Sequence, residues 1–182
     1  PLTDTDTPID KFGHNLKSPR KTINGFKAIP SLLLGLANNH SYDQGFEGLE
    51  STIHVLTQAN IAYCGAGNDV NEAKKPYIFT KDGIRLGIYM CTENEFSSAT
   101  MHSAGANPFD VFESFDDVQK LKEQCDYVVV LYHGGKEFYR YPSPMLQRYC
   151  RKFVEKGASL VLCQHSHCIG AREDYKAGTI IY

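Results

Sequence analysis

The sequence predicts an α/β fold in which apolar strands end in polar residues at one edge of a sheet. An apolar run that begins at Leu32 is followed by a helix-like repeat and a second short apolar run, and this strand, helix, strand order favours parallel pairing with a right-handed crossover. Three apolar runs also lead into histidine: the first into His40, and two later ones into His133 and His165. Polar residues at the carboxyl ends of neighbouring parallel strands are typical of a binding crevice.

Length and composition favour one domain and set limits on its partners. The chain has 182 residues and is 42% hydrophobic, enough to bury one core, so we expect residues 1–182 to form a single domain. The net charge of -2, with scattered Lys and Arg, carries no electrostatic footprint for nucleic acid. Polar residues 1–30 show no sustained periodicity and predict an irregular arm.

The remaining elements follow from apolar periodicity and turn signals. Asp82-Gly83 between two apolar runs predicts a hairpin, and Gly157 is placed to end a helix. The aperiodic residues 92–114 predict a long surface loop. We expect helices at 46–59, 115–124 and 144–156, and strands from residue 32 to before residue 38 and at 61–64, 77–80, 84–91, 126–132, 159–163, 173–175 and 179–182.

Several features of the sequence bear on the cellular compartment and on whether the chain is part of a longer protein. No apolar segment approaches the roughly 20 residues of a spanning helix, and the N-terminus has no signal-peptide pattern. Six cysteines are too few for a disulfide scaffold, so we expect reduced thiols, which slightly favours the cytoplasm and leaves the cell envelope open. Because the chain begins with Pro1 and ends on the strand residue Tyr182, we expect it to be part of a longer protein.

The strand-end residues predict a transition-metal site. If the three runs that lead into histidine are neighbours in one sheet, their polar ends share a crevice. Imidazole and amide ligands suit Mn, Fe or Zn better than Mg or Ca. Two adjacent ions would activate a water and clamp a phosphate ester, with His40 as general acid or phosphoryl contact and Asp43 orienting His40. The candidate metal ligands are Asn39, His133, His165 and His167.

Each candidate also has a structural interpretation. Asn38 and Asn39 suit a turn, since asparagine tolerates positive φ, Asp43 suits a helix N-cap, and His133 alone suits a hydrogen-bonded loop. A local zinc knot is a further, cramped alternative. Its ligands would be Cys163, His165, His167 and Cys168. The histidines without strand-end placement are interpreted as surface residues: His14, His54 and His102.

Several motifs in order resemble one known family. Leu36-Ala-Asn-Asn-His-Ser-Tyr-Asp-Gln-Gly-Phe-Glu-Gly-Leu49 is followed by Gly65-Ala-Gly67 before Ala73-Lys-Lys-Pro76, and then by His133-Gly-Gly-Lys-Glu137-Phe138. Gly157-Ala-Ser-Leu-Val161 and His165-Ser-His167 complete the set. Together these segments resemble the bacterial capsule-synthesis (poly-γ-glutamate synthesis, CapA-like) family of the calcineurin-like metallophosphoesterase superfamily.

The resemblance implies a four-layer αββα fold with a centre for two divalent transition metal ions. It assigns Asn39, His133, His165 and His167 as ligands and His40 as the catalytic histidine. Gln164 stands where the superfamily usually has Gly. The family's first acidic ligands are expected before residue 1 and its Gly-Asn-Phe stretch after residue 182, so the fold would lack its first strand and C-terminal part here, and the metal occupancy of this part alone stays open.

Three functions remain open at this point. The first is a metal-dependent phosphoesterase-like hydrolase acting on a small or polymeric anionic substrate. The second is a non-catalytic component of capsule or polyanion export that keeps the fold as a binding platform, which Gln164 favours. The third is a hydrolase of γ-glutamyl amide bonds, which the same activated water could attack.

Overall fold

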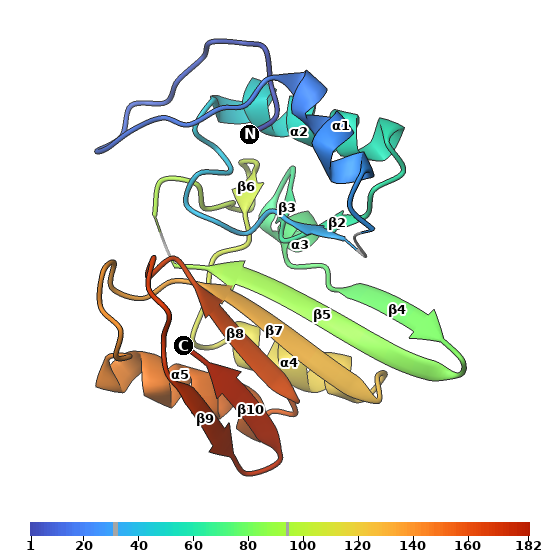
Figure 1. The fold of residues 1–182 in the computed structure, drawn as a ribbon, viewed down its shortest axis with the longest axis vertical. Coiled ribbons are helices and arrows are strands. Elements are labelled where there is room, and N and C mark those ends of the chain that lie inside the picture. Colours follow the sequence, from blue (N-terminus) through green and yellow to red (C-terminus); the bar gives the residue numbers. More distant parts are fainter. Residues whose placement is uncertain (31–32, 94) are drawn as a thin grey trace. The chain divides into compact units, whose positions relative to one another are not determined.

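The computed structural model describes residues 1–30, 33–93 and 95–182 and divides into two compact units. Unit 1 comprises Pro1–Lys75 and Asn94–Pro108, and unit 2 comprises Pro76–Glu93 and Phe109–Tyr182. Each unit is described by itself (Figure 1). In the part of the chain that is described, no helix is long and apolar enough to cross a membrane.

Unit 2 is built on a six-stranded mixed sheet. The strand order is β4-β5-β7-β8-β10-β9, with β5, β7, β8 and β10 mutually parallel and β4 and β9 antiparallel at the two edges. The strands are β4 (Tyr77–Lys81), β5 (Ile84–Thr92), β7 (Tyr127–His133), β8 (Leu160–Gln164), β9 (Arg172–Tyr175) and β10 (Gly178–Ile181). All six strands coincide with sequence predictions to within two residues at each end.

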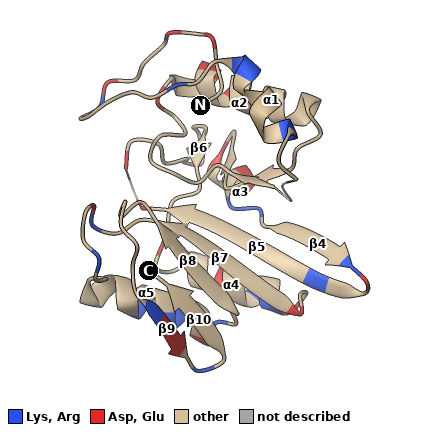
Figure 2. Cartoon of the chain, viewed as in Figure 1, with Lys and Arg blue, Asp and Glu red and all other residues tan. Residues whose placement is uncertain are grey.

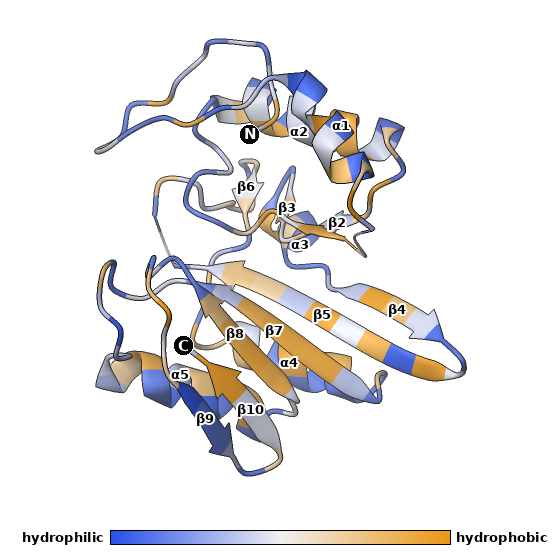
Figure 3. Ribbon diagram, in the orientation of Figure 1, coloured by the Kyte–Doolittle hydropathy of each residue, from blue (hydrophilic) through white to orange (hydrophobic). Residues whose placement is uncertain are grey.

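The two helices of unit 2, α4 (Ser114–Lys122) and α5 (Pro144–Glu155), pack on one face of this sheet (Figure 1). Strand β7 alternates accordingly: Val128, Val130 and Tyr132 are buried in the core that these helices complete, and the residues between them are less buried. The central strands β7 and β8 contain no charged residue (Figure 2) and are apolar along most of their length (Figure 3). The helix-facing core therefore determines which side chains of β7 turn inward.

Helix α5 has defined signals at both ends. Ser143 is the N-cap, its Oγ accepts a hydrogen bond from the backbone N–H of Leu146 at 3.1 Å, and Pro144 occupies the first turn. Gly157 follows the C-cap with φ of +111°, a left-handed conformation that favours glycine. The predicted helix end at Gly157 is thus confirmed.

Unit 1 contains shorter elements. Strands β1 (Leu34–Gly35) and β2 (Tyr63–Cys64) flank helix α2 (Gly45–Gln58) and pair in parallel, as the strand, helix, strand order predicted. The expected strand start at Leu32 lies outside the described residues. The other elements are η1 (Arg20–Thr22), α1 (Ile23–Lys27), β3 (Ala66–Gly67), α3 (Val70–Ala73) and β6 (Gly105–Ala106).

Three expectations need correction. Strand β1 pairs with β2 in a separate two-stranded sheet and is not a hydrogen-bonded neighbour of β7 or β8. The expected loop at 92–114 contains β6, whose residues pair antiparallel with β3. The expected irregular arm contains the turns η1 and α1, because Ile23 is apolar enough to be buried beside Val55 and Leu56 of α2.

Candidate metal centre

The candidate metal centre in unit 2 is formed by the two loops that follow the adjacent parallel strands β7 and β8. His133, the last residue of β7, lies in register with Gln164, the last residue of β8. Main-chain bonding continues beyond the strands: Gly134 N–H donates to the Gln164 carbonyl at 3.1 Å, and Phe138 N–H donates to the Ser166 carbonyl at 2.8 Å. The loop after β7 is therefore held alongside the loop after β8.

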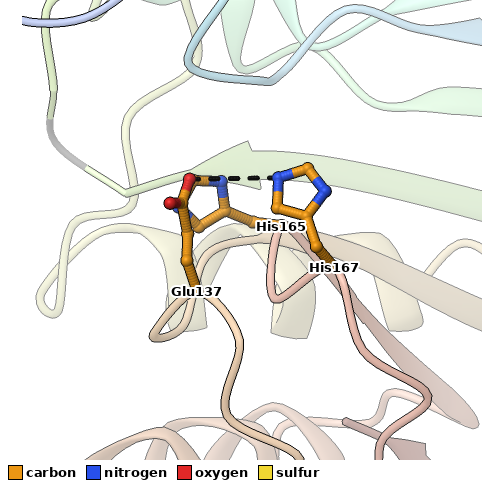
Figure 4. A group of neighbouring side chains, drawn as sticks. All are labelled: Glu137, His165 and His167. Atoms are coloured by element: carbon orange, nitrogen blue, oxygen red, sulfur yellow. Dashed lines mark ion pairs between the residues drawn. The ribbon is translucent and has the colours of Figure 1, made fainter.

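This pairing brings one carboxylate and two imidazoles together (Figure 4). An oxygen of Glu137 lies 3.7 Å from His165 Nε2 and 3.9 Å from His167 Nε2. One candidate ligand atom from each of the three residues lies within 4.8 Å of the other two. The His165 side chain is 8% exposed, whereas those of Glu137 and His167 are 48% and 61% exposed, so one candidate ligand is buried and two face solvent.

The spacing and chemistry of this cluster fit a divalent transition metal. Ligand atoms that share one tetrahedral ion at about 2.1 Å lie roughly 3.4 Å apart. The two carboxylate-to-imidazole separations exceed this by a few tenths of an ångström and are longer than a hydrogen bond. Two imidazoles with one carboxylate suit Zn, Fe or Mn. The three residues therefore offer a ligand set that suits a metal, with their candidate ligand atoms within 4.8 Å of one another.

The backbone of the loop after β8 adopts uncommon conformations. His165 has φ of +91° and His167 has φ of +54°, both in the region that L-residues rarely occupy. Such strain is often retained where it positions functional groups. Gln164 does not have a positive φ, so the absence of glycine there imposes no conformational conflict. The ring of Phe138, also at positive φ, stacks on the ring of His167 with centroids 5.8 Å apart.

Glu93 supports the loop that carries Glu137. One of its carboxylate oxygens accepts hydrogen bonds from Gly135 N–H at 3.0 Å and the Tyr132 hydroxyl at 3.4 Å, and its own N–H donates to the His133 carbonyl at 3.0 Å. Burial is the main cause that raises the pKa of Tyr132, and the Glu93 carboxylate is the second. The phenol therefore stays protonated and able to donate. A Cβ on Gly134 would lie 2.5 Å from Glu93 Cγ, so the close approach requires glycine.

Unit 1 holds the other candidate residues. Asp43 is fully buried, and its Oδ2 lies 2.7 Å from His40 Nδ1. The N-cap of α2 is Gln44, so the N-cap interpretation of Asp43 is wrong. Asn38 makes the turn, since its side-chain oxygen accepts a hydrogen bond from His40 N–H at 2.9 Å, but neither Asn38 nor Asn39 has a positive φ.

The predicted site residues thus fall into two sets. His133, His165 and His167 lie together in unit 2. The ring centroids of His133 and His165 are 5.0 Å apart, and those of His165 and His167 are 6.0 Å apart. Asn39, His40 and Asp43 belong to unit 1, and their convergence with the histidines of unit 2 remains a prediction. The roles assigned to these six residues likewise remain predictions.

Other sequence interpretations have clearer outcomes. None of the six cysteines forms a disulfide, and the metal-capable cluster contains no thiol within the described ranges, so the zinc-knot alternative has no support. The three histidines interpreted as surface residues are exposed: His14, His54 and His102.

Two residues of these sites, Glu137 and Lys11, were not among the site residues predicted from the sequence. Glu137 stands in a motif that was recognised, four residues after His133, and a carboxylate so close to a candidate ligand was a usable signal. Lys11 lies in the expected irregular arm and contacts Asp43. No local pattern points to it, because its partner is 32 residues away.

Comparison with solved structures identifies the fold. A crystal structure described as a putative 5′-nucleotidase from Staphylococcus aureus in complex with α-ketoglutarate matches with a TM-score of 0.62 and 19% identity, over 89% of this chain and 34% of that one. The fold is therefore of the metallophosphoesterase-like α/β class that the sequence predicted.

Sequence comparison gives the family. All residues from 1 to 182 match the family described as bacterial capsule synthesis protein PGA_cap, and the chain belongs to that family. Capsule biosynthesis protein CapA of Bacillus anthracis is 28% identical over 179 residues, covering 95% of this chain and 43% of that protein. PGA biosynthesis protein CapA of Bacillus subtilis is 27% identical over 176 residues, covering 95% and 46%. The chain thus spans less than half the length of these relatives.

Proposed function

We propose that this chain is part of a metal-dependent, phosphoesterase-like hydrolase related to the capsule and poly-γ-glutamate biosynthesis proteins. The observation that carries the proposal is the convergence of Glu137, His165 and His167 at the carboxyl ends of adjacent parallel strands. A transition metal held there would supply Lewis acidity and an activated water for hydrolysis. The metallophosphoesterase-like fold supports this reaction class.

The residues of the chain take distinct roles in this proposal. His165 anchors the ligand set from its buried position, with Glu137 and His167 completing it on the exposed side. His133, with its ring beside that of His165, and Asn39 serve the second of two ions. His40 donates to the leaving group or to the phosphoryl oxygens, and Asp43 holds its Nδ1.

The proposed substrate is anionic. Lys136 and Arg140 line a small cavity together with Ser166, which stands between His165 and His167 in the sequence, so the two loops that carry the candidate ligands also contribute two cationic residues to a cavity. Lys136 also lines an adjoining cavity of about 310 Å³ with Glu93 and Tyr149. Cationic side chains beside a hydrolytic centre suit phosphate esters and also polyglutamate, the polymer in the name of the Bacillus subtilis relative.

Metal content and hydrolysis of a generic phosphodiester test the proposal in the full-length protein. We expect the purified protein to retain Mn, Fe or Zn and to hydrolyse bis-p-nitrophenyl phosphate. His165→Ala should abolish both properties because it removes the buried ligand. His54→Ala, which changes an exposed histidine on α2, is the matched control and should behave as wild type.

Other outcomes select other functions. A protein that neither retains a transition metal nor loses activity in His165→Ala would refute the proposal. Retention of metal with saturable binding of a phosphate ester but no turnover would favour the binding platform. Release of glutamate peptides from poly-γ-glutamate, without phosphodiester hydrolysis, would assign the amide reaction instead.

A further inference from the structure

A buried ion pair lies behind His40 in unit 1. The ammonium of Lys11 contacts Asp43 Oδ1, and the two side chains are 4% and 0% exposed. The other carboxylate oxygen, Asp43 Oδ2, accepts a hydrogen bond from the backbone N–H of Leu16 at 2.6 Å and lies 2.7 Å from His40 Nδ1. Of the three charged or titratable side chains in this group, that of His40 is the most exposed, at 38%.

The charges of this group set the orientation of the imidazole. A carboxylate excluded from water is stable only when it is paired and hydrogen-bonded, and Lys11 supplies the positive charge. An ionised carboxylate can only accept, so His40 must present an N–H at Nδ1 to Asp43, whether the ring is neutral or protonated. Lys11 Nζ lies 3.3 Å from the same Nδ1, but an ammonium has no acceptor, so only the carboxylate can accept a hydrogen bond from a protonated Nδ1. His40 Nε2 is therefore the atom left for a substrate.

Several contacts hold the arm that delivers Lys11. Ile9 N–H donates to the Asp43 carbonyl at 3.2 Å. Thr7 pairs twice with Gln44: its N–H donates to Gln44 Oε1 at 2.9 Å, and its hydroxyl donates to the Gln44 carbonyl at 2.8 Å. The arm is thus fixed to the two residues that directly precede helix α2.

We propose that Lys11 is a positioning residue for His40: by pairing with Asp43 it holds the carboxylate against Nδ1, and so directs Nε2 toward the substrate. The proposal rests on the hydrolytic role proposed for His40. Lys11 itself touches neither substrate nor metal in this account. Its effect is therefore expected in the turnover rate rather than in substrate affinity.

The test compares Lys11→Met with Lys11→Arg and with Lys17→Met in the full-length protein. Lys17 belongs to the same arm, but its Nζ pairs with the exposed Asp6, which makes it a matched control. The first readout is the ¹⁵N spectrum of the His40 imidazole, assigned with His40→Gln. The second is kcat and KM for the phosphodiester.

In wild type and Lys17→Met we expect a single His40 form in which Nδ1 carries a proton toward Asp43, with a second proton on Nε2 when the ring acts as an acid. Lys11→Met should lose that single form, and kcat should fall by on the order of 10-fold or more, within the contribution of a positioned general acid, with KM little changed. Lys11→Arg should keep most of the single His40 form and most of the wild-type kcat, because it keeps the positive charge. If Lys11→Met does not fold, Lys11→Gln, which keeps a donor but no charge, should show the same two losses.

An unchanged His40 spectrum together with wild-type kcat in folded Lys11→Met or Lys11→Gln would overturn the proposal. Failure of the proposed function is distinguishable from this result. A protein without hydrolase activity leaves the imidazole spectrum as the deciding measurement for Lys11. Conversely, a hydrolase whose His40 is insensitive to Lys11 rejects only the positioning role.

Discussion

The close packing of Gly134 against Glu93 predicts that Gly134→Ala weakens the metal centre without removing a ligand. The added Cβ would lie 2.5 Å from Glu93 Cγ, 2.7 Å from Cδ and 2.9 Å from Oε1, all well inside van der Waals contact. Glu93 must then move away, and its hydrogen bond from Gly135 N–H is lost. A bond to a charged acceptor contributes about 1.5–3 kcal/mol, and overpacking costs a similar amount.

The same movement releases the loop that carries Glu137. Substituting residues that orient metal ligands typically weakens binding about 10- to 100-fold, and we expect Gly134→Ala to fall in that range. Chelator competition on the full-length protein measures the metal affinity, and urea unfolding measures stability. Gly25→Ala is the control, since a Cβ there meets nothing within 4 Å and φ is not positive. Wild-type metal affinity and stability in Gly134→Ala would show that Glu93 does not hold this loop.

Two further predictions concern the core and the pH response of unit 2. Phe153→Ala should lower the free energy of unfolding by about 3–5 kcal/mol, because the ring is fully buried against Phe109 and Phe115. Urea unfolding measures this loss, and Phe138→Ala, which removes an exposed ring, is the control. A loss in Phe153→Ala no larger than that in Phe138→Ala would contradict the prediction. Hydrogen bonds from Lys176, then Tyr175 and Lys152, lower the pKa of Glu155 from 4.5 to about 2. Because the folded pKa lies below the unfolded one, this stabilisation is present above pH 4.5 and is lost as pH falls toward 2. The thermal midpoints of wild type and Glu155→Gln should therefore differ at pH 6 and converge near pH 2, and a gap that is constant with pH would contradict the prediction.

Periodicity predicted the regular elements of unit 2 because burial there follows simple patterns. Strand β7 alternates between the helix-facing core and the opposite face, and helix α5 carries Leu146, Cys150 and Phe153 on its buried side. Such repeats are local and can be read from one sequence. The placement of His133, His165 and His167 near one another followed from the parallel register of β7 and β8.

Other features depend on contacts that no local pattern contains. Strand β1 has two residues and pairs with β2 as predicted, but its apolar run could not reveal that β7 and β8 belong to a different sheet. The short strand β6 contains only Gly105 and Ala106, which carry no strand signal, and it forms by pairing with β3. Lys11 is a charged residue in a polar arm, and the residues that it contacts where it is buried, Asp43 and His40, are far away in the sequence.

The hydrogen bonds that continue from β7 and β8 into their loops make the positions of the candidate ligands depend on loop length as well as on the Glu93 side chain. Gly134 bonds to the Gln164 carbonyl and Phe138 to the Ser166 carbonyl through backbone N–H groups, which any residue except proline supplies. Exposed positions between these bonds, such as Lys136, can therefore change identity and leave Glu137 opposite His165. A single inserted or deleted residue in either loop would shift one ligand past the other and dismantle the cluster.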